Sequence, residues 1–190
     1  MAQGVTAQAT PRPLLRPIEL GDLEALADLD ARYARATGQS QVMDRASVHY
    51  YLRSGHSFVA ERVQLGAAKP AGHSEGQAEL DGFVLAHSTW SGRTAVVRVE
   101  RVVVASEADP EAHTVASALT AAVVKSAYDA GVYRLVAAVA AGDRLAHGAL
   151  EASGFTASQE VSYQRLLGAG ALSGGGSPER AGVGGGEHDG

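Results

Sequence analysis

A strand–helix–strand–helix pattern in the second half of the chain constrains its fold more than any other feature. An apolar strand over Thr94–Ala105 is followed by a long alanine-rich helix over Glu111–Ala130. A second strand over Tyr133–Ala140 is followed by a shorter helix over Arg144–Ser153. A helix that connects two neighbouring strands in this way makes them parallel. The helix then begins at the mouth of the sheet, where its free amides and partial positive charge suit a phosphate group.

Further elements extend the predicted sheet on both sides. Two helices begin at Asp22 and Asp44 and end at Gly38 and Gly55, and we expect the Asp22 carboxylate to cap the first of them. The remaining predicted strands are Leu14–Leu20, Ser57–Arg62, Gly82–Ser88 and an antiparallel pair, Phe155–Ser158 with Val161–Leu167. The order of elements is then β-α-α-β-β-β-α-β-α-β-β.

The chain of 190 residues predicts one domain with soft ends. We expect residues 1–12, which show no apolar period, to be disordered. Residues 168–190 hold ten of the 23 glycines and are expected to form a disordered tail. The folded domain is therefore predicted to span residues 13–167. Within it, residues 63–81 are rich in Gly, Ala and polar residues and are expected to form a flexible hairpin loop.

Composition argues against several classes of protein. The net charge is −5 and no basic run alternates with aromatic residues, so nucleic acid is not an expected partner. There is no cysteine, which fits a cytoplasmic protein and excludes thiol catalysis. No apolar run approaches the roughly 20 residues that span a membrane. The seven histidines show no metal-ligand spacing, so no metal site is expected.

Several segments resemble the GNAT (GCN5-related N-acetyltransferase) superfamily. Arg16-Pro17 followed by Gly21-Asp22 is similar to the common opening of that family, and Ala146–Phe155 is similar to the end of its fourth helix. The segments Gly55–Glu61, Gly82–Gly92 and Val123–Tyr133 resemble more closely a small bacterial family of GNAT-like proteins of unknown function. The resemblance implies an α/β, GNAT-like acyl-CoA N-acyltransferase fold. In that fold a mixed central sheet of about 6–7 strands is flanked by four helices.

The resemblance also implies a site for acetyl-CoA, in the cleft where the Thr94–Ala105 and Tyr133–Ala140 strands diverge. The family signature, Arg/Gln-x-x-Gly-x-Gly/Ala, corresponds here to Glu111–Ala116, of which only Ala116 fits. The nearby Glu107 and Asp109 are acidic and repel a pyrophosphate. The backbone amides from Thr114 to Ser117 are retained, however, and His113 adds a cation below neutral pH. The implied cofactor-binding residues are Val103, Val104, His113, Thr114, Val115, Ala116, Ser117 and Asp143, the last of which is alternatively a helix cap.

Candidates for proton transfer are Glu100, His87 and Tyr128. Glu100 lies among valines, where desolvation raises a carboxyl pKa toward the value that a general base needs. The alternative for Glu100 is an ion pair with Arg98, and the alternative for His87 is a hydrogen-bonded core histidine. Tyr128 is either an acid or a packing residue. Leu150 stands where the family often has a tyrosine that acts as the general acid.

Two functions follow from these observations. The first is an N-acetyltransferase that transfers an acyl group from acetyl-CoA to a primary amine, on a small molecule or a peptide, by direct attack. Much of the rate would come from holding the amine and the thioester together. The second is a catalytically inactive GNAT-like module that binds a ligand or a protein, including a second copy of itself as a homodimer. The incomplete signature and Leu150 favour this alternative.

Overall fold

The computed structural model describes residues 13–62 and 79–158. The predicted disorder of residues 1–12 and 168–190, nearly all of the predicted loop, and the predicted strand Val161–Leu167 lie outside these residues. All described helices and strands belong to one compact unit.

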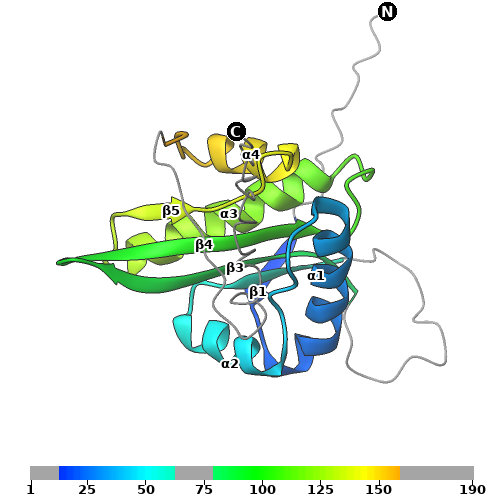
Figure 1. Ribbon diagram of the computed structural model, residues 1–190, viewed down its shortest axis with the longest axis horizontal. Helices are drawn as coiled ribbons and strands as arrows, with labels where there is room; N and C mark the ends of the chain where they lie inside the picture. Colours follow the sequence, from blue (N-terminus) through cyan, green and yellow to red (C-terminus); the bar gives the residue numbers. More distant parts are fainter. Residues whose placement is uncertain (1–12, 63–78, 159–190) are drawn as a thin grey trace, which may run out of the picture. The chain divides into compact units, whose positions relative to one another are not determined.

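A mixed sheet forms the centre of this unit (Figure 1). Its five strands lie side by side in chain order, with antiparallel pairing from the first to the fourth and parallel pairing between the last two. They are β1 (Leu14–Pro17), β2 (Phe58–Glu61), β3 (Leu80–Ser91), β4 (Thr94–Val104) and β5 (Leu135–Ala137). This confirms the predicted mixed α/β sheet, with fewer strands among the described residues than expected.

Two strand predictions were wrong in extent or type. Pairing of β5 with β4 covers only Leu135–Ala137, and the amide of Ala138 makes a further bond to Val99 before the chain turns away. The predicted strand Phe155–Ser158 is irregular. The amide of Phe155 bonds instead to the carbonyl of Leu150 at 3.0 Å, so it helps to close the end of the last helix.

Helices cover both faces of the sheet (Figure 1). On one face lie α1 (Leu23–Thr37) and α2 (Arg45–Ser54), preceded by the short 3-10 helix η1 (Leu20–Asp22). On the other face lie α3 (Ala112–Asp129) and α4 (Arg144–Ala152). The four α-helices agree with the predicted number and positions.

Alternation along β3 sends side chains into two separate cores. Phe83 and Leu85 pack with α1 and α2, whereas Val84 and Ala86 pack with α3 and α4. Each core is built from hydrophobic residues that are almost fully buried, and the core under α1 and α2 also holds aromatic rings. The sheet is therefore covered on both sides, as the apolar strands predicted.

Asp22 does not cap α1 as expected. Its carboxylate makes no bond to the first turn of that helix. Instead it accepts two hydrogen bonds of 2.7 Å from Arg16 and one of 2.8 Å from the amide of Glu19. A charged partner on β1 competes successfully with the neutral amides, because charge-assisted hydrogen bonds are stronger.

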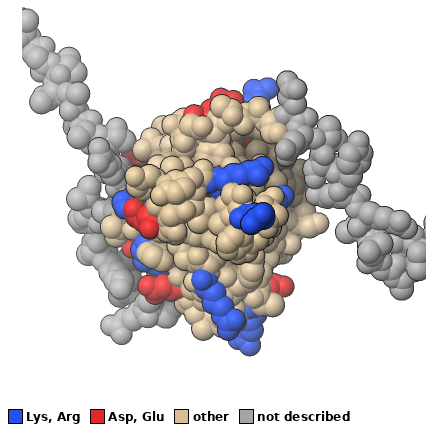
Figure 2. Space-filling view, turned by 90° about the vertical axis from the view of Figure 1, so that its left-hand side faces the viewer, with Lys and Arg blue, Asp and Glu red and all other residues tan. Residues whose placement is uncertain are grey.

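Charge is dispersed on the face at the end of the β3–β4 hairpin. Figure 2 shows that this face is mainly uncharged and that its Lys and Arg side chains form separate spots. None of the described helices is both long and apolar enough to cross a membrane.

Close contact between β3 and β4 depends on Gly82. A Cβ atom at this position would lie 2.4 Å from the carbonyl oxygen of Val103 and 3.3 Å from Cγ1 of Val115. Two backbones therefore meet here at a distance that only glycine permits. This approach also brings α3 close to the sheet.

We predict that Gly82→Ala destabilises the fold, because a backbone oxygen cannot move aside cheaply. The expected loss is about 1–3 kcal/mol or more in the free energy of unfolding, measured by chemical denaturation. Gly21→Ala is the matched control, since a Cβ atom there would meet nothing within 4 Å. Equal stability of the two variants would contradict the close approach of β3 and β4.

Candidate active site

The two parallel strands diverge at a β-bulge in β4. On β3, Leu85 pairs with Arg101 and Ala86 pairs with Val99, so Glu100 has no partner across this ladder. Val99 is also the last β4 residue that pairs with β5. Beyond this point no strand among the described residues pairs with β4 along that edge. The bulge and the divergence therefore coincide at Glu100.

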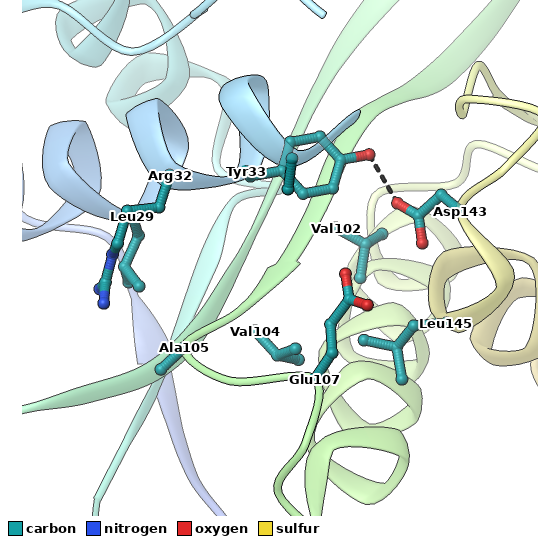
Figure 3. Close-up of a pocket in the computed structure, with 10 residues that line it drawn as sticks. Leu29, Arg32, Tyr33, Val102, Val104, Ala105, Glu107, Asp143 and Leu145 are labelled. Carbon is teal, nitrogen blue, oxygen red and sulfur yellow. Dashed lines mark hydrogen bonds between the residues drawn. The ribbon is translucent and has the colours of Figure 1, made fainter. Parts of the chain in front are cut away.

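A cavity of about 170 Å³ opens where β4 has left β5 (Figure 3). It lies between α1, the end of β4 and the start of α4, and its wall is mostly apolar. Its lining residues are Leu29, Arg32, Tyr33, Ala36, Val102, Val104, Ala105, Glu107, Asp143 and Leu145. In Figure 3 the carboxylate of Glu107 points toward Tyr33 and Asp143, whereas Arg32 points away from them.

One hydrogen bond closes this cavity on one side. The hydroxyl of Tyr33 on α1 donates to Asp143 at 2.6 Å, and both residues are buried (Figure 3). Asp143 also accepts a bond of 2.8 Å from the amide of Ala146, so it caps α4 as predicted. Burial, followed by the bond to Asp143, raises the pKa of Tyr33 well above its usual value. Tyr33 therefore stays protonated near neutral pH.

A buried ion pair, Arg101 with Asp30, packs against the ring of Tyr33. The guanidinium of Arg101 lies 4.9 Å from the centre of the Tyr33 ring and 3.3 Å from Asp30. Both charged side chains are almost fully buried, at 3% and 0% exposure. Asp30 also accepts hydrogen bonds from the amides of Val42 and Met43, at 2.5 and 2.7 Å. The pair therefore fixes the α1–α2 connection against the sheet.

The start of α3 differs from the predicted phosphate cradle. The side chain of Asp109 accepts from the amide of Glu111 at 2.8 Å, and its carbonyl accepts from the amide of Ala112 at 3.0 Å. The amide of Val115 is already bonded to the carbonyl of Glu111. Of the predicted amides from Thr114 to Ser117, those from Val115 onward belong to the helix ladder, because only the first turn has free N–H groups. No hydrogen bond is found among the described residues for the amides of His113 and Thr114.

The other predicted cofactor residues fall in different environments. Val104 lines the cavity, but Val103 faces the opposite core. Val115 and Ala116 are buried in the core beneath α3. His113 lies against α4, where a Cβ atom on Gly148 would be 3.0 Å from its Nε2, and its Nδ1 lies 3.3 Å from the Ser117 hydroxyl. Thr114 is exposed.

The predicted bases Glu100 and His87 come together on the α2-facing side of the sheet. Glu100 forms an ion pair of 2.9 Å with Arg98, as its alternative interpretation proposed. His87 pairs with Arg98 across the β3–β4 ladder. Burial lowers the pKa of His87, while the charge of Glu100 opposes this shift. The buried Nδ1 of His87 has no hydrogen-bond partner among the described residues.

Two tyrosines of α2 complete this cluster. The Tyr50 and Tyr51 rings lie 5.0 and 6.1 Å from the His87 ring. Burial and the charge of Glu100 raise the pKa of Tyr51 to about 12. We name the group of Arg98, Glu100, His87, Tyr50 and Tyr51 the β4–α2 cluster. Sequence analysis missed Tyr33, Tyr50 and Tyr51 as site residues, because helical spacing alone does not distinguish a packing tyrosine from one at a cavity or beside ionisable groups.

Tyr128 is not part of either group. It is 68% exposed on α3, and its ring contacts only that of Tyr133 among the aromatic rings described, at 5.9 Å. No group of acidic residues, histidines and cysteines suited to a metal ion occurs among residues 13–62 and 79–158.

Comparison with known proteins assigns the chain to a family. The family of proteins of unknown function DUF1999 matches residues 14–172. The chain belongs to this family. The crystal structure of TTHA1254 from Thermus thermophilus is 32% identical, with a TM-score of 0.60 over 82% of this chain and 98% of that chain. A search of curated proteins finds none that matches.

Structures with a named activity share the fold at lower identity. An acetyltransferase from Trypanosoma brucei is 20% identical, with a TM-score of 0.54 over 80% of this chain and 99% of that one. An aminoglycoside N-acetyltransferase, AAC(6')-Iy, was solved in complex with CoA. It is 18% identical, with a TM-score of 0.57 over 85% of this chain and 99% of that one. The DUF1999 chain therefore has the fold of GNAT acetyltransferases, which confirms the resemblance seen in the sequence.

We predict that Tyr33→Phe destabilises the protein by about 1–3 kcal/mol, because it leaves a buried carboxylate oxygen of Asp143 without its partner. The free energy of unfolding in urea measures this loss. Tyr128→Phe is the control, since an exposed position is expected to change stability by no more than about 0.5 kcal/mol. Indistinguishable values for the two variants would show that the bond across the cavity contributes little.

Proposed function

We propose that this DUF1999 protein is an N-acyltransferase that transfers an acyl group, such as acetyl, from acyl-CoA to a primary amine by direct attack. The main observation in support is that β4 and β5 diverge at the bulge. A cavity opens beyond the last paired residues, and the carboxylate of Glu100 lies at the bulge itself. A cavity with apolar walls suits the thioester end of a donor, and a carboxylate at the bulge suits an amine.

Residues of this chain fit the donor in part. Val102, Val104 and Leu145 would contact the apolar thioester arm and exclude water from it. The amides of His113 and Thr114 would remain for the phosphates. Asp109 and Glu111 lie beside them and would oppose negative charge. The arrangement therefore favours modest rather than tight binding of CoA.

Glu100 is the proposed base, acting directly or through water. For this role its carboxylate must reach the amine, and the 29% exposure of its side chain leaves it open to one. The amine nitrogen forms a bond to the acyl carbon, and the bond from carbon to sulfur breaks. The acceptor starts as an ammonium group, so one of its three protons passes to Glu100, the second leaves with the sulfur, and the third stays on the amide nitrogen. Leu150 is buried and apolar, so it supplies no proton.

A ligand-binding module without catalysis is the second candidate. Its specific support is the bonding of Asp109 to the first amides of α3, which removes part of the phosphate site. The two candidates differ in whether acetyl-CoA binds and whether it is consumed.

We expect acetyl-CoA to raise the melting temperature. A ligand at 100 times its dissociation constant stabilises the fold by about 2.7 kcal/mol. For a domain of this size that corresponds to roughly 5–10 °C. Thr114→Glu should abolish the shift, because it adds negative charge beside one of the two free amides. Thr94→Glu, at an exposed position in the β3–β4 hairpin, should retain it. An unchanged shift in Thr114→Glu would place CoA elsewhere, and no shift at millimolar acetyl-CoA would favour the non-catalytic module.

We expect Glu100→Gln to lower kcat by about 10²–10⁴-fold, the usual contribution of a general base. The measurement is release of free CoA thiol in the presence of a panel of primary amines. Glu151→Gln changes an exposed carboxylate on α4 and serves as the control. Full activity of the Glu100 variant would mean that the amine loses its proton by another route.

A further inference from the structure

The β4–α2 cluster presents two opposite charges side by side. Arg98 and Glu100 are alternate residues of β4 on the face opposite Val97 and Val99, which pack under α3. Their charged atoms lie 2.9 Å apart, and the side chains are 45% and 29% exposed. The ion pair is therefore open to solvent, so another pair of charges can reach both groups.

A simple cationic amine does not suit this pair. If its ammonium group replaced Arg98 at the Glu100 carboxylate, the guanidinium would lose its partner and two cations would lie close together. A molecule that carries both an ammonium and a carboxylate avoids this cost. Its ammonium pairs with Glu100 and its carboxylate pairs with Arg98, which can donate two parallel hydrogen bonds to a carboxylate.

The spacing between the charges of Arg98 and Glu100 favours a ligand whose own ammonium and carboxylate groups lie close together. In an α-amino acid, the ammonium nitrogen and the nearer carboxylate oxygen are separated by about the length of a hydrogen bond. The separation of 2.9 Å between Nε of Arg98 and Oε1 of Glu100 is closely similar. A peptide N-terminus lacks the adjacent carboxylate, and the ammonium of a lysine side chain is remote from one.

An aromatic surface adjoins the ion pair. His87 lies opposite Arg98 on β3, and the ring of Tyr50 lies 5.0 Å from the ring of His87. Tyr50 is 51% exposed, whereas Tyr51 beside it is buried, so Tyr50 alone of the two offers a free ring surface. Such a surface suits an apolar or aromatic substituent.

We propose that the acyl acceptor is a free α-amino acid with an apolar or aromatic side chain, recognised through its carboxylate by Arg98 and through its side chain by Tyr50. This inference rests on the proposed function and assigns its acceptor. The ammonium group loses one proton to Glu100, the nitrogen bonds to the acyl carbon, and the products are an N-acylamino acid and the free thiol. Arg98 is a specificity-determining residue in this account.

The test compares L-phenylalanine with L-phenylalaninamide, which has nearly the same shape but no carboxylate charge. With acetyl-CoA and the full-length protein, kcat/KM for phenylalanine should exceed that for the amide at least about tenfold. This direction is informative because the amide is the less basic amine and reacts more readily without a binding site. Arg98→Gln should remove the preference, and Arg35→Gln, at an exposed position on α1, should preserve it.

Each outcome separates this inference from the proposed function. Acetylation of phenylalaninamide as fast as phenylalanine, or faster, would overturn the inference and leave the acyltransferase intact. A preference that survives Arg98→Gln would also overturn it, by removing the assigned contact. If acetyl-CoA is consumed with neither compound nor with any other primary amine, the proposed function fails and the inference fails with it.

Discussion

The structure depends on the unequal pairing of the two edges of β4. Along one edge β4 pairs with β3 over nearly its full length, and along the other it pairs with β5 over three residues. A strand held on one edge can remain extended while its second edge is released. Glu100 is the extra residue at the point of release, and the bulge turns both Glu100 and Arg101 toward the face that carries α1 and α2. The cavity and the cluster of ionisable groups both follow from this local change in register.

The walls of the cavity are fixed by polar contacts between distant parts of the chain. Asp30 holds the α1–α2 connection, Arg101 bridges Asp30 and the Tyr33 ring, and Tyr33 reaches Asp143 at the start of α4. Because these groups are buried, loss of one partner leaves another without compensation. The network therefore connects α1 to the start of α4 through directional contacts.

The sequence predicted which helices and strands form better than it predicted where they begin and end. The long helix α3 and the strand β4 have strong apolar patterns, so their positions followed from periodicity, and Asp143 was predictable as a cap because only local bonds are involved. The length of β5 was not predictable, since it depends on where β4 releases it. Asp22 was misassigned because its partner, Arg16, comes from a neighbouring strand. The free amides of α3 begin one residue earlier than predicted and end at Thr114, because Asp109 sets the start of the helix through a bond that the sequence pattern does not reveal.

The charges around the cavity bear on how sulfur would leave in an acyl transfer. The ionisable groups that line it are Arg32, Tyr33, Glu107 and Asp143, and Arg32 points away from the acids (Figure 3). The nearby buried cation, Arg101, is already balanced by Asp30. A thiolate formed beside two carboxylates would be opposed by their charge, whereas a neutral thiol would not. Tyr33 holds its proton in a bond to Asp143, so the proton for sulfur would come more readily from the attacking nitrogen. In the proposed transfer, loss of a proton by the amine and departure of the sulfur would therefore be linked steps. A proton donor at the position of Leu150 would then matter less than it would beside a cationic cavity.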